Sequence, residues 1–311
     1  MPSAHVAAAL ALMLVAAFSP LSAQGRGRYA SVNGLRMYYE IHGTGRPLVL
    51  LHGGGSTITT TFGGILPALA RTHQVIAVEL QAHGHTADRG VPSSFQQDAD
   101  DVAELLAQLK IDGADVFGFS NGGQTALQLA IAHPRVVRRL ILASMFYSRD
   151  GVDPGFWTAM DNAKFSDMPQ LYKDAFLAIN NDSAALLTMF TRDAQRMQHF
   201  QSWTANQVRS IQAPTLVVLG DRDVPRPEHG VEMYLLLPHA RLAILPGTHG
   251  SYLGEALTAD PTSGTPGAFV TLVEEFLREE SRARGGGSGG VSIDLITFEA
   301  SAQSVRRTHR H

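Results

Sequence analysis

The chain has 311 residues, of which 44% are hydrophobic and 17% are charged, and this composition is typical of a globular protein with a sizeable core. Its length suits one α/β domain that carries an insertion. A formal net charge of −3 gives no sign of a nucleic-acid partner or of an anionic membrane partner. Because the sequence has no cysteine, disulfides, thiolate catalysis and zinc ribbons are excluded.

The first residues resemble an export signal. Residues 6–18 form an apolar run of signal-peptide length, and residues 21–24 (LSAQ) supply the small side chains of a cleavage site. The run is too short to span a bilayer comfortably, so we expect no integral membrane span. We predict a signal peptide over 1–23, cleaved after Ala23, and a periplasmic or secreted protein. The segment before the run lacks Lys and Arg, which leaves an uncleaved anchor or a misassigned start as alternatives.

Apolar runs alternate with helical patterns along most of the chain. Strands are predicted as a hairpin within 28–43 that turns at Asn33-Gly34, and then at 47–51, 74–80, 114–119, 136–144, 214–220 and 240–247. Helices are predicted at 62–70, 94–110, 122–133, 231–237 and 267–280. Because the strands are apolar throughout and alternate with helices, the predicted fold class is α/β, with a mostly parallel eight-stranded sheet flanked by helices.

The pattern is interrupted between the sixth and seventh predicted strands. Residues 146–210 have a helical texture and many large apolar side chains, which indicates a small helical cap inserted into the core. Most of its aromatic residues are expected to hold the cap together, and a few of them to shape a pocket for an acyl or aryl group. Phe146, Trp157 and Trp203 are the candidates for substrate contact.

The insertion divides the predicted α/β core into two parts, residues 24–145 and 211–284. Beyond the core, the sequence GGGSGG is a flexible linker by composition. It opens a flexible C-terminal tail, residues 285–311, to which no function is assigned.

Ser120 lies between Gly118 and Gly122 in a G-x-S-x-G pattern. The pattern alone is weak evidence, because it also occurs around Ser288 in the glycine-rich linker. Ser120, however, lies where a predicted strand meets a predicted helix, which is the setting of a nucleophile elbow. Flanking glycines are needed in so tight a turn, and the amides at the start of the helix favour developing negative charge. We therefore predict that Ser120 is a nucleophile.

A serine hydroxyl needs a base within reach and a residue that orients this base. His249 directly follows the last predicted strand, and Asp221 and Asp223 follow the strand before it. These strands end at one edge of the sheet, so the three kinds of side chain can meet there. The sequence LLHGGGS, directly after another predicted strand, offers backbone N–H groups that can form an oxyanion hole with the amide of Asn121.

The segments LLHGGGS, VIAVELQAHGHTAD, VFGFSNGGQTALQLAIAHP, PTLVVLGDRDVP and LPGTHG together resemble the α/β-hydrolase fold. The resemblance covers residues 29–280 and is to capped serine hydrolases, a group that includes carboxylesterases, cofactor-free haloperoxidase-like esterases and C–C bond hydrolases. It implies that Asp223 rather than Asp221 orients His249. It also implies that Gly54 supplies the first amide of the oxyanion hole, and that no cofactor is needed.

The resemblance implies a serine hydrolase that cleaves a small apolar carboxylic ester or lactone through an acyl-enzyme intermediate. A C–C bond hydrolase with the same triad is one alternative, and a non-catalytic ligand receptor on the same fold is another. Most acidic residues of the cap, a group that includes Asp193, are expected to lie on solvated helix faces. The oligomeric state is left open.

One segment departs from the family pattern. In ELQAHGHT, Glu79 stands where the pattern has aspartate and Ala82 where it has glycine, and we expect a local structural adjustment there. His83 and His85, two residues apart, suggest a metal site at first sight. No further ligand recurs at suitable spacing, so we predict no metal. The resemblance implies that His83 is a structural residue of its loop, and we interpret His52 in the same way.

Overall fold

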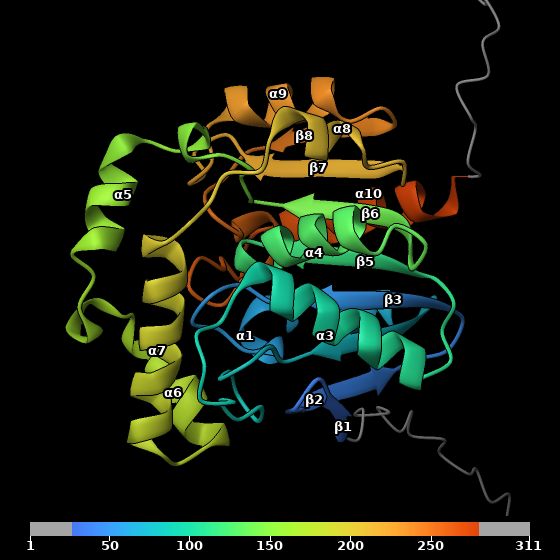
Figure 1. Ribbon diagram of the computed structural model, residues 1–311. Helices are drawn as coiled ribbons and strands as arrows, with labels where there is room; N and C mark the ends of the chain where they lie inside the picture. Colours follow the sequence, from blue (N-terminus) through green and yellow to red (C-terminus); the bar gives the residue numbers. More distant parts are fainter. Residues whose placement is uncertain (1–26, 280–311) are drawn as a thin grey trace, which may run out of the picture. The chain divides into compact units, whose positions relative to one another are not determined.

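The computed structural model describes residues 27–279, so the predicted signal peptide and C-terminal tail lie outside the described residues. One eight-stranded sheet runs in the order β1-β2-β4-β3-β5-β6-β7-β8 (Figure 1). Its strands are β1 (Arg28–Val32), β2 (Leu35–His42), β3 (Arg46–Leu51), β4 (His73–Val78), β5 (Ala114–Phe119), β6 (Val137–Ala143), β7 (Thr215–Gly220) and β8 (Ala240–Leu245). The β1–β2 and β2–β4 pairs are antiparallel and the others are parallel, which confirms the predicted mostly parallel sheet.

Helices cover both faces of the sheet (Figure 1). One face packs against α3 (Phe95–Gln108), α4 (Asn121–Ala132), α8 (Ala205–Arg209) and α9 (Pro227–Leu236). The other face packs against α1 (Ile58–Phe62), α2 (Leu66–Leu69) and α10 (Thr265–Arg278). Along β3, Leu48 and Leu50 face the second layer, whereas Val49 and Leu51 face the first. All four side chains are buried, which explains why the strand is apolar throughout rather than alternating with polar residues.

The insertion after β6 forms a helical cap, as predicted. It carries α5 (Pro154–Asp161), α6 (Gln170–Ile179) and α7 (Ser183–Gln198), which lie beyond the carboxyl ends of the parallel strands (Figure 1). Helix α8, at the end of the predicted cap segment, packs instead on the sheet beside α9, where Val208 joins the core. Within residues 27–279, no helix combines the length and apolar character that a bilayer crossing requires.

Candidate active site

Ser120 lies in a strained turn between β5 and α4. Its φ of 52° and ψ of −123° are unusual for a residue with a side chain. The two flanking glycines make this turn possible, because a Cβ on Gly118 would lie 2.1 Å from the carbonyl oxygen of Gly122. A Cβ on Gly122 would lie 2.1 Å from the carbonyl oxygen of Leu51. The glycines of the G-x-S-x-G pattern are therefore required by backbone packing.

Ser120, His249 and Asp223 form one chain of hydrogen bonds. The Ser120 Oγ lies 3.1 Å from His249 Nε2, and His249 Nδ1 lies 2.7 Å from Asp223 Oδ1. Because a carboxylate only accepts, Nδ1 carries the proton and Nε2 is free to accept the proton of the serine. Asp221 does not take part, since it is exposed and accepts from the N–H of Gly247.

Asp223 is held in its ionised form by several donors. Its carboxylate accepts from the N–H groups of Gly220 and Val224, at 2.8 and 2.7 Å, and from Ser144 Oγ at 2.5 Å. Burial acts to raise the pKa of Asp223, but the hydrogen bonds from His249, Ser144 and Gly220 outweigh it and hold the pKa below its usual range. The carboxylate can therefore stabilise an imidazolium at His249 throughout the neutral pH range.

Ser144 and Tyr252 extend this chain, and the sequence analysis did not identify them. Ser144 directly follows β6 with a φ of 50°, and its Oγ lies 2.8 Å from the Tyr252 hydroxyl. Both side chains are buried. The signal that marks the other site residues, a polar side chain at the carboxyl end of a parallel strand, applies equally to Ser144. The order of donors is thus Tyr252 to Ser144 to Asp223.

The loop after β3 faces Ser120. In the described part of the chain, the N–H of Gly54 has no hydrogen-bond partner, although those of Gly53 and Gly55 do. The N–H of Asn121 is likewise unpaired among the described residues, because it lies at the first position of α4. Both residues line the pocket that contains Ser120. The two predicted oxyanion-hole amides are therefore available to bind an oxygen atom.

His52 holds the start of this loop. Its Nδ1–H donates to the carbonyl oxygen of Gly53 at 2.8 Å, and its Nε2 accepts from the N–H of Leu80 at 3.1 Å. A ring that accepts through one nitrogen is neutral, and burial lowers the pKa of His52 to about 3. His52 is placed to fix the loop, as predicted, and does not contact Ser120.

Comparison with known proteins agrees with this geometry. Residues 46–182 match the family model of the alpha/beta hydrolase fold. A 2-hydroxymuconate semialdehyde hydrolase from Pseudomonas sp. (strain CF600) is 29% identical over 231 residues, which cover 66% of this chain and 80% of that protein. The chain is a serine hydrolase of the α/β-hydrolase fold.

Two solved structures show the same architecture in full. The enol-lactonase from Burkholderia xenovorans LB400 matches 81% of this hydrolase and 100% of its own chain, with a TM-score of 0.64 and 23% identity. The esterase RhEst1 from Rhodococcus sp. ECU1013 matches 81% of this hydrolase and 98% of its own chain, with a TM-score of 0.62 and 25% identity. The likeness therefore extends over the core and the cap together.

The hydrolase has a cavity of about 300 Å³ between Ser120 and the cap. Its apolar lining includes Phe146, Phe156, Met160, Met168, Phe190 and Met197. Phe146, predicted to contact substrate, is thus among the lining residues. Ionisable side chains at the cavity, apart from His249, are Lys164, Asp167, Tyr172 and Asp193.

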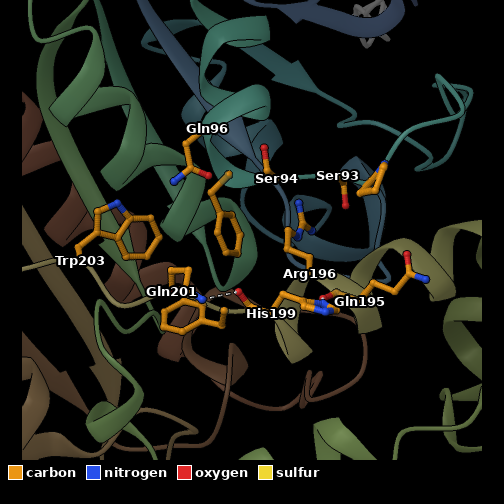
Figure 2. A pocket seen from close by; sticks show the side chains of 11 residues that line it. Ser93, Ser94, Gln96, Gln195, Arg196, His199, Gln201 and Trp203 are labelled. Carbon is orange, nitrogen blue, oxygen red and sulfur yellow. Dashed lines mark hydrogen bonds between the residues drawn. The ribbon is translucent and has the colours of Figure 1, made fainter.

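Trp157 and Trp203, also predicted to contact substrate, need a correction, because neither is among the described residues that line this cavity. Trp157 packs edge-on against Phe146, with ring centroids 5.7 Å apart, and the Arg149 guanidinium lies over the Trp157 ring. Trp203 lines a second cavity of about 490 Å³, with Phe95 and Phe200 (Figure 2). The aromatic content of the cap indicated a pocket, but it could not show which rings face Ser120.

The cap touches the histidine loop through a buried pair. The Tyr172 hydroxyl, from α6, donates to Glu255 Oε1 at 2.8 Å. Burial raises the pKa of Glu255, and burial together with the neighbouring carboxylate raises that of Tyr172. Glu255 belongs to the segment that follows His249, so α6 contacts the part of the core that carries the base.

The two departures from the family pattern have a local explanation. Ala82 has a φ of 65°, so it adopts the left-handed conformation that glycine would adopt without strain. The longer Glu79 side chain reaches the next turn, where its Oε2 accepts from the N–H of His85 at 2.6 Å and lies 2.9 Å from His85 Nδ1. His83 instead bonds Asp193, so the two histidines have separate partners. Within residues 27–279, no three potential ligands converge on a metal-sized site.

Proposed function

We propose that this hydrolase cleaves small uncharged carboxylic esters or lactones through an acyl-enzyme intermediate on Ser120. The observation that carries the proposal is the position of the Ser120 Oγ. It lies at an apolar cavity and is hydrogen-bonded to a histidine whose other nitrogen is held by a buried carboxylate. This arrangement meets the requirements for an activated serine nucleophile.

In the first half of the proposed reaction, His249 Nε2 takes the hydroxyl proton while Ser120 Oγ forms a bond to the carbonyl carbon. The N–H groups of Gly54 and Asn121 bind the resulting oxyanion. The intermediate collapses, the bond to the leaving oxygen breaks, and His249 protonates the departing alcohol. In the second half, His249 takes a proton from a water molecule while the water oxygen forms a bond to the acyl carbon. The bond between this carbon and Ser120 Oγ then breaks, His249 returns the proton to Ser120, and the carboxylic acid leaves.

The cavity supports an uncharged substrate of modest size. A volume of about 300 Å³ with walls of phenylalanine and methionine favours an acyl or aryl group of a few to about ten heavy atoms. The carboxylate of Asp167 at the same cavity disfavours an anionic acyl chain. A lactone places its acyl and leaving groups in one molecule and requires no different machinery.

Hydrolysis of a C–C bond is the second candidate. The likeness to the 2-hydroxymuconate semialdehyde hydrolase favours it. The chain offers Lys164 as the basic side chain at the cavity, besides His249, that could pair with a substrate carboxylate. This candidate predicts that Lys164→Met raises KM for a carboxylate-bearing diketone substrate and leaves KM for an uncharged ester unchanged.

The test is hydrolysis of p-nitrophenyl esters, from acetyl to decanoyl, by the wild type, Ser120→Ala and Ser93→Ala. Ser93 is a matched control, because it is a serine that lines the other cavity. We expect kcat/KM to fall by about four orders of magnitude or more in Ser120→Ala and by less than about twofold in Ser93→Ala. Equal activity in all three proteins would contradict the assignment of Ser120. Absence of turnover in the wild type would reject the ester proposal in favour of C–C hydrolysis or ligand binding.

We also propose, from the sequence of residues 1–23, that the protein is exported and processed. N-terminal sequencing of the mature chain from a periplasmic extract should begin at Gln24. A chain that retains its first residues and stays in the cytoplasm would contradict export.

A further inference from the structure

A buried chain of charges connects the cap to the core beside the active site. Helix α7 supplies Asp193 and Arg196, and the core supplies His83 and Asp98. Asp193 Oδ2 lies 3.0 Å from His83 Nε2, and Asp193 Oδ1 lies 2.5 Å from Arg196 Nη2. Arg196 Nη1 in turn lies 2.7 Å from Asp98 Oδ2. Asp193, whose side chain is only 14% exposed, is thus an ion partner of the core, and it is an exception to the expectation that most cap carboxylates lie on solvated faces.

Asp193 also binds the backbone of the oxyanion loop. Its Oδ2 accepts the N–H of Gly55 at 2.6 Å. Gly55, with a φ of 67°, directly follows Gly54, whose N–H is unpaired in the described part of the chain. The same carboxylate oxygen lies 3.2 Å from the position that a Cβ on Gly54 would occupy. A side chain of the cap therefore holds the residue next to the amide that is offered to the substrate oxygen.

The cations around Asp193 keep its charge from opposing catalysis. His83 Nδ1 lies 2.8 Å from the carbonyl oxygen of Gln81, and its Nε2 faces Asp193. Since a carbonyl and a carboxylate both only accept, both ring nitrogens carry protons and His83 is an imidazolium. A bare carboxylate beside the oxyanion would repel the developing negative charge. His83 and Arg196 compensate the charge of Asp193, which leaves its hydrogen bond to Gly55 as its local effect.

A purely structural ion cluster would not need this last hydrogen bond. His83 and Arg196 already satisfy Asp193 as an ion partner. Arg196, which lines the second cavity (Figure 2), also donates to Asp98. By also accepting the N–H of Gly55, Asp193 contacts the oxyanion loop. Through this hydrogen bond, the position of α7 affects the direction of the peptide group between Gly54 and Gly55.

We propose that Asp193 is a positioning residue, which orients the oxyanion loop through the N–H of Gly55, so that docking of the cap and completion of the oxyanion hole are one event. The kinetic part of this inference rests on the proposed acyl transfer at Ser120. When α7 moves away, Gly55 loses its acceptor and the Gly54 N–H loses its fixed direction. An oxyanion donor that is misdirected stabilises the transition state less, while ground-state binding changes little.

The kinetic test compares Asp193→Ala with Asp174→Ala. Alanine removes the acceptor of the Gly55 N–H, whereas the side-chain oxygen of an asparagine could still accept it. Asp174 is a matched control, because it also belongs to the cap but is exposed, accepts from Gln170 and lies outside the described lining of the cavity. We expect kcat to fall about ten- to a hundredfold in Asp193→Ala, with KM within about threefold of wild type, and no such change in Asp174→Ala. An unchanged kcat, or a rise in KM alone, would overturn the proposal.

A second readout needs no substrate, so it separates this proposal from that of the esterase activity. In the wild type, the Gly55 amide should exchange with deuterium about tenfold more slowly than the Gly54 amide, because among the described residues only the Gly55 amide of the two has an acceptor. Asp193→Ala should abolish most of this difference, and Asp174→Ala should preserve it. Equal exchange of the two amides in the wild type would overturn the proposal even if Asp193→Ala fails to fold.

Discussion

The core and the cap contribute to the active site by different physical means. The core presents Ser120, Asp223 and His249 at the carboxyl ends of β5, β7 and β8, on turns held by backbone hydrogen bonds and by contacts too close for a Cβ. The cap reaches the same site through side chains, with Asp193 on one catalytic loop and Tyr172 on the segment after the other. Backbone packing fixes the reacting groups, whereas the cap is connected to them through side chains.

The core and the cap also differ in what keeps their unfavourable features stable. The core contains Ser120 and Ser144 at positive φ, which close packing can maintain. The cap contains buried ions, which are stable only while their partners remain in place. The predictions below test whether the core keeps its structure by close packing and the cap keeps its structure only while its ion partners are in place.

The largest expected effect concerns the orientation of His249. Asp223→Asn replaces the acceptor of Nδ1–H by an amide that can favour the wrong tautomer, so kcat should fall by about three to four orders of magnitude. Asp221→Asn is the matched control, since Asp221 lies two residues away, and its exposed carboxylate accepts from the N–H of Gly247 and lies 3.8 Å from Arg222 Nε. Steady-state kinetics of both variants would check this, and similar losses in the two would contradict the triad.

The next effect concerns the packing of the elbow. In Gly122→Ala the new Cβ would meet backbone oxygens of Leu51 and His52 at 2.1 and 2.5 Å. Backbone cannot move aside as a flexible side chain can, so the free energy of unfolding should fall by about 3 kcal/mol. Gly267→Ala, where nothing lies within 4 Å of the Cβ, should change it by less than about 1 kcal/mol. Urea denaturation measures both, and a tolerated Gly122→Ala would refute a rigid elbow.

A smaller effect is a pH dependence of stability that arises from the contact between His83 of the core and Asp193 of the cap. Burial acts to lower the pKa of His83, but Asp193 outweighs it and raises the pKa above its ordinary value of 6.5. The charged or titratable groups that face His83 are Asp193 and Arg196 from α7, Asp98 from α3 and His52 from the loop after β3. A raised pKa in the folded state means that the stabilisation is complete below about pH 6.5 and is lost as the pH rises through the folded value.

His83→Gln removes this titration. The wild type should therefore exceed the variant in thermal stability by more at pH 6 than at pH 9. Melting temperatures of both proteins across this range provide the measurement. A difference that stays constant with pH would show that His83 is not charged in the folded protein.

The sequence was sufficient for the features that backbone rules determine. Alternating strands and helices predicted the sheet, and polar residues at strand ends predicted that Ser120 and His249 would meet. Ser144 also lies at the end of a strand, but its hydrogen bond to Asp223 depends on the positive φ that orients its side chain. No sequence pattern predicted this φ.

The residues of the cap could not be assigned in this way. Asp193 has the same local sequence properties as an exposed helix carboxylate, and only the docking of α7 on the core gives it His83 and Gly55 as partners. For the same reason, counting aromatic residues could not separate Phe146, which lines the cavity, from Trp157 and Trp203, which do not. Tertiary packing determines which partners these cap side chains contact.

The most direct test of the account is covalent labelling with a fluorophosphonate, followed by intact-mass and peptide mass spectrometry. This reagent reacts with a serine that has an adjacent base and an oxyanion hole, and it needs no knowledge of the natural substrate. We expect one adduct per wild-type chain, on Ser120, and none on Ser120→Ala. An unlabelled wild type, or an adduct on a different serine, would contradict the central claim that Ser120 is the activated nucleophile.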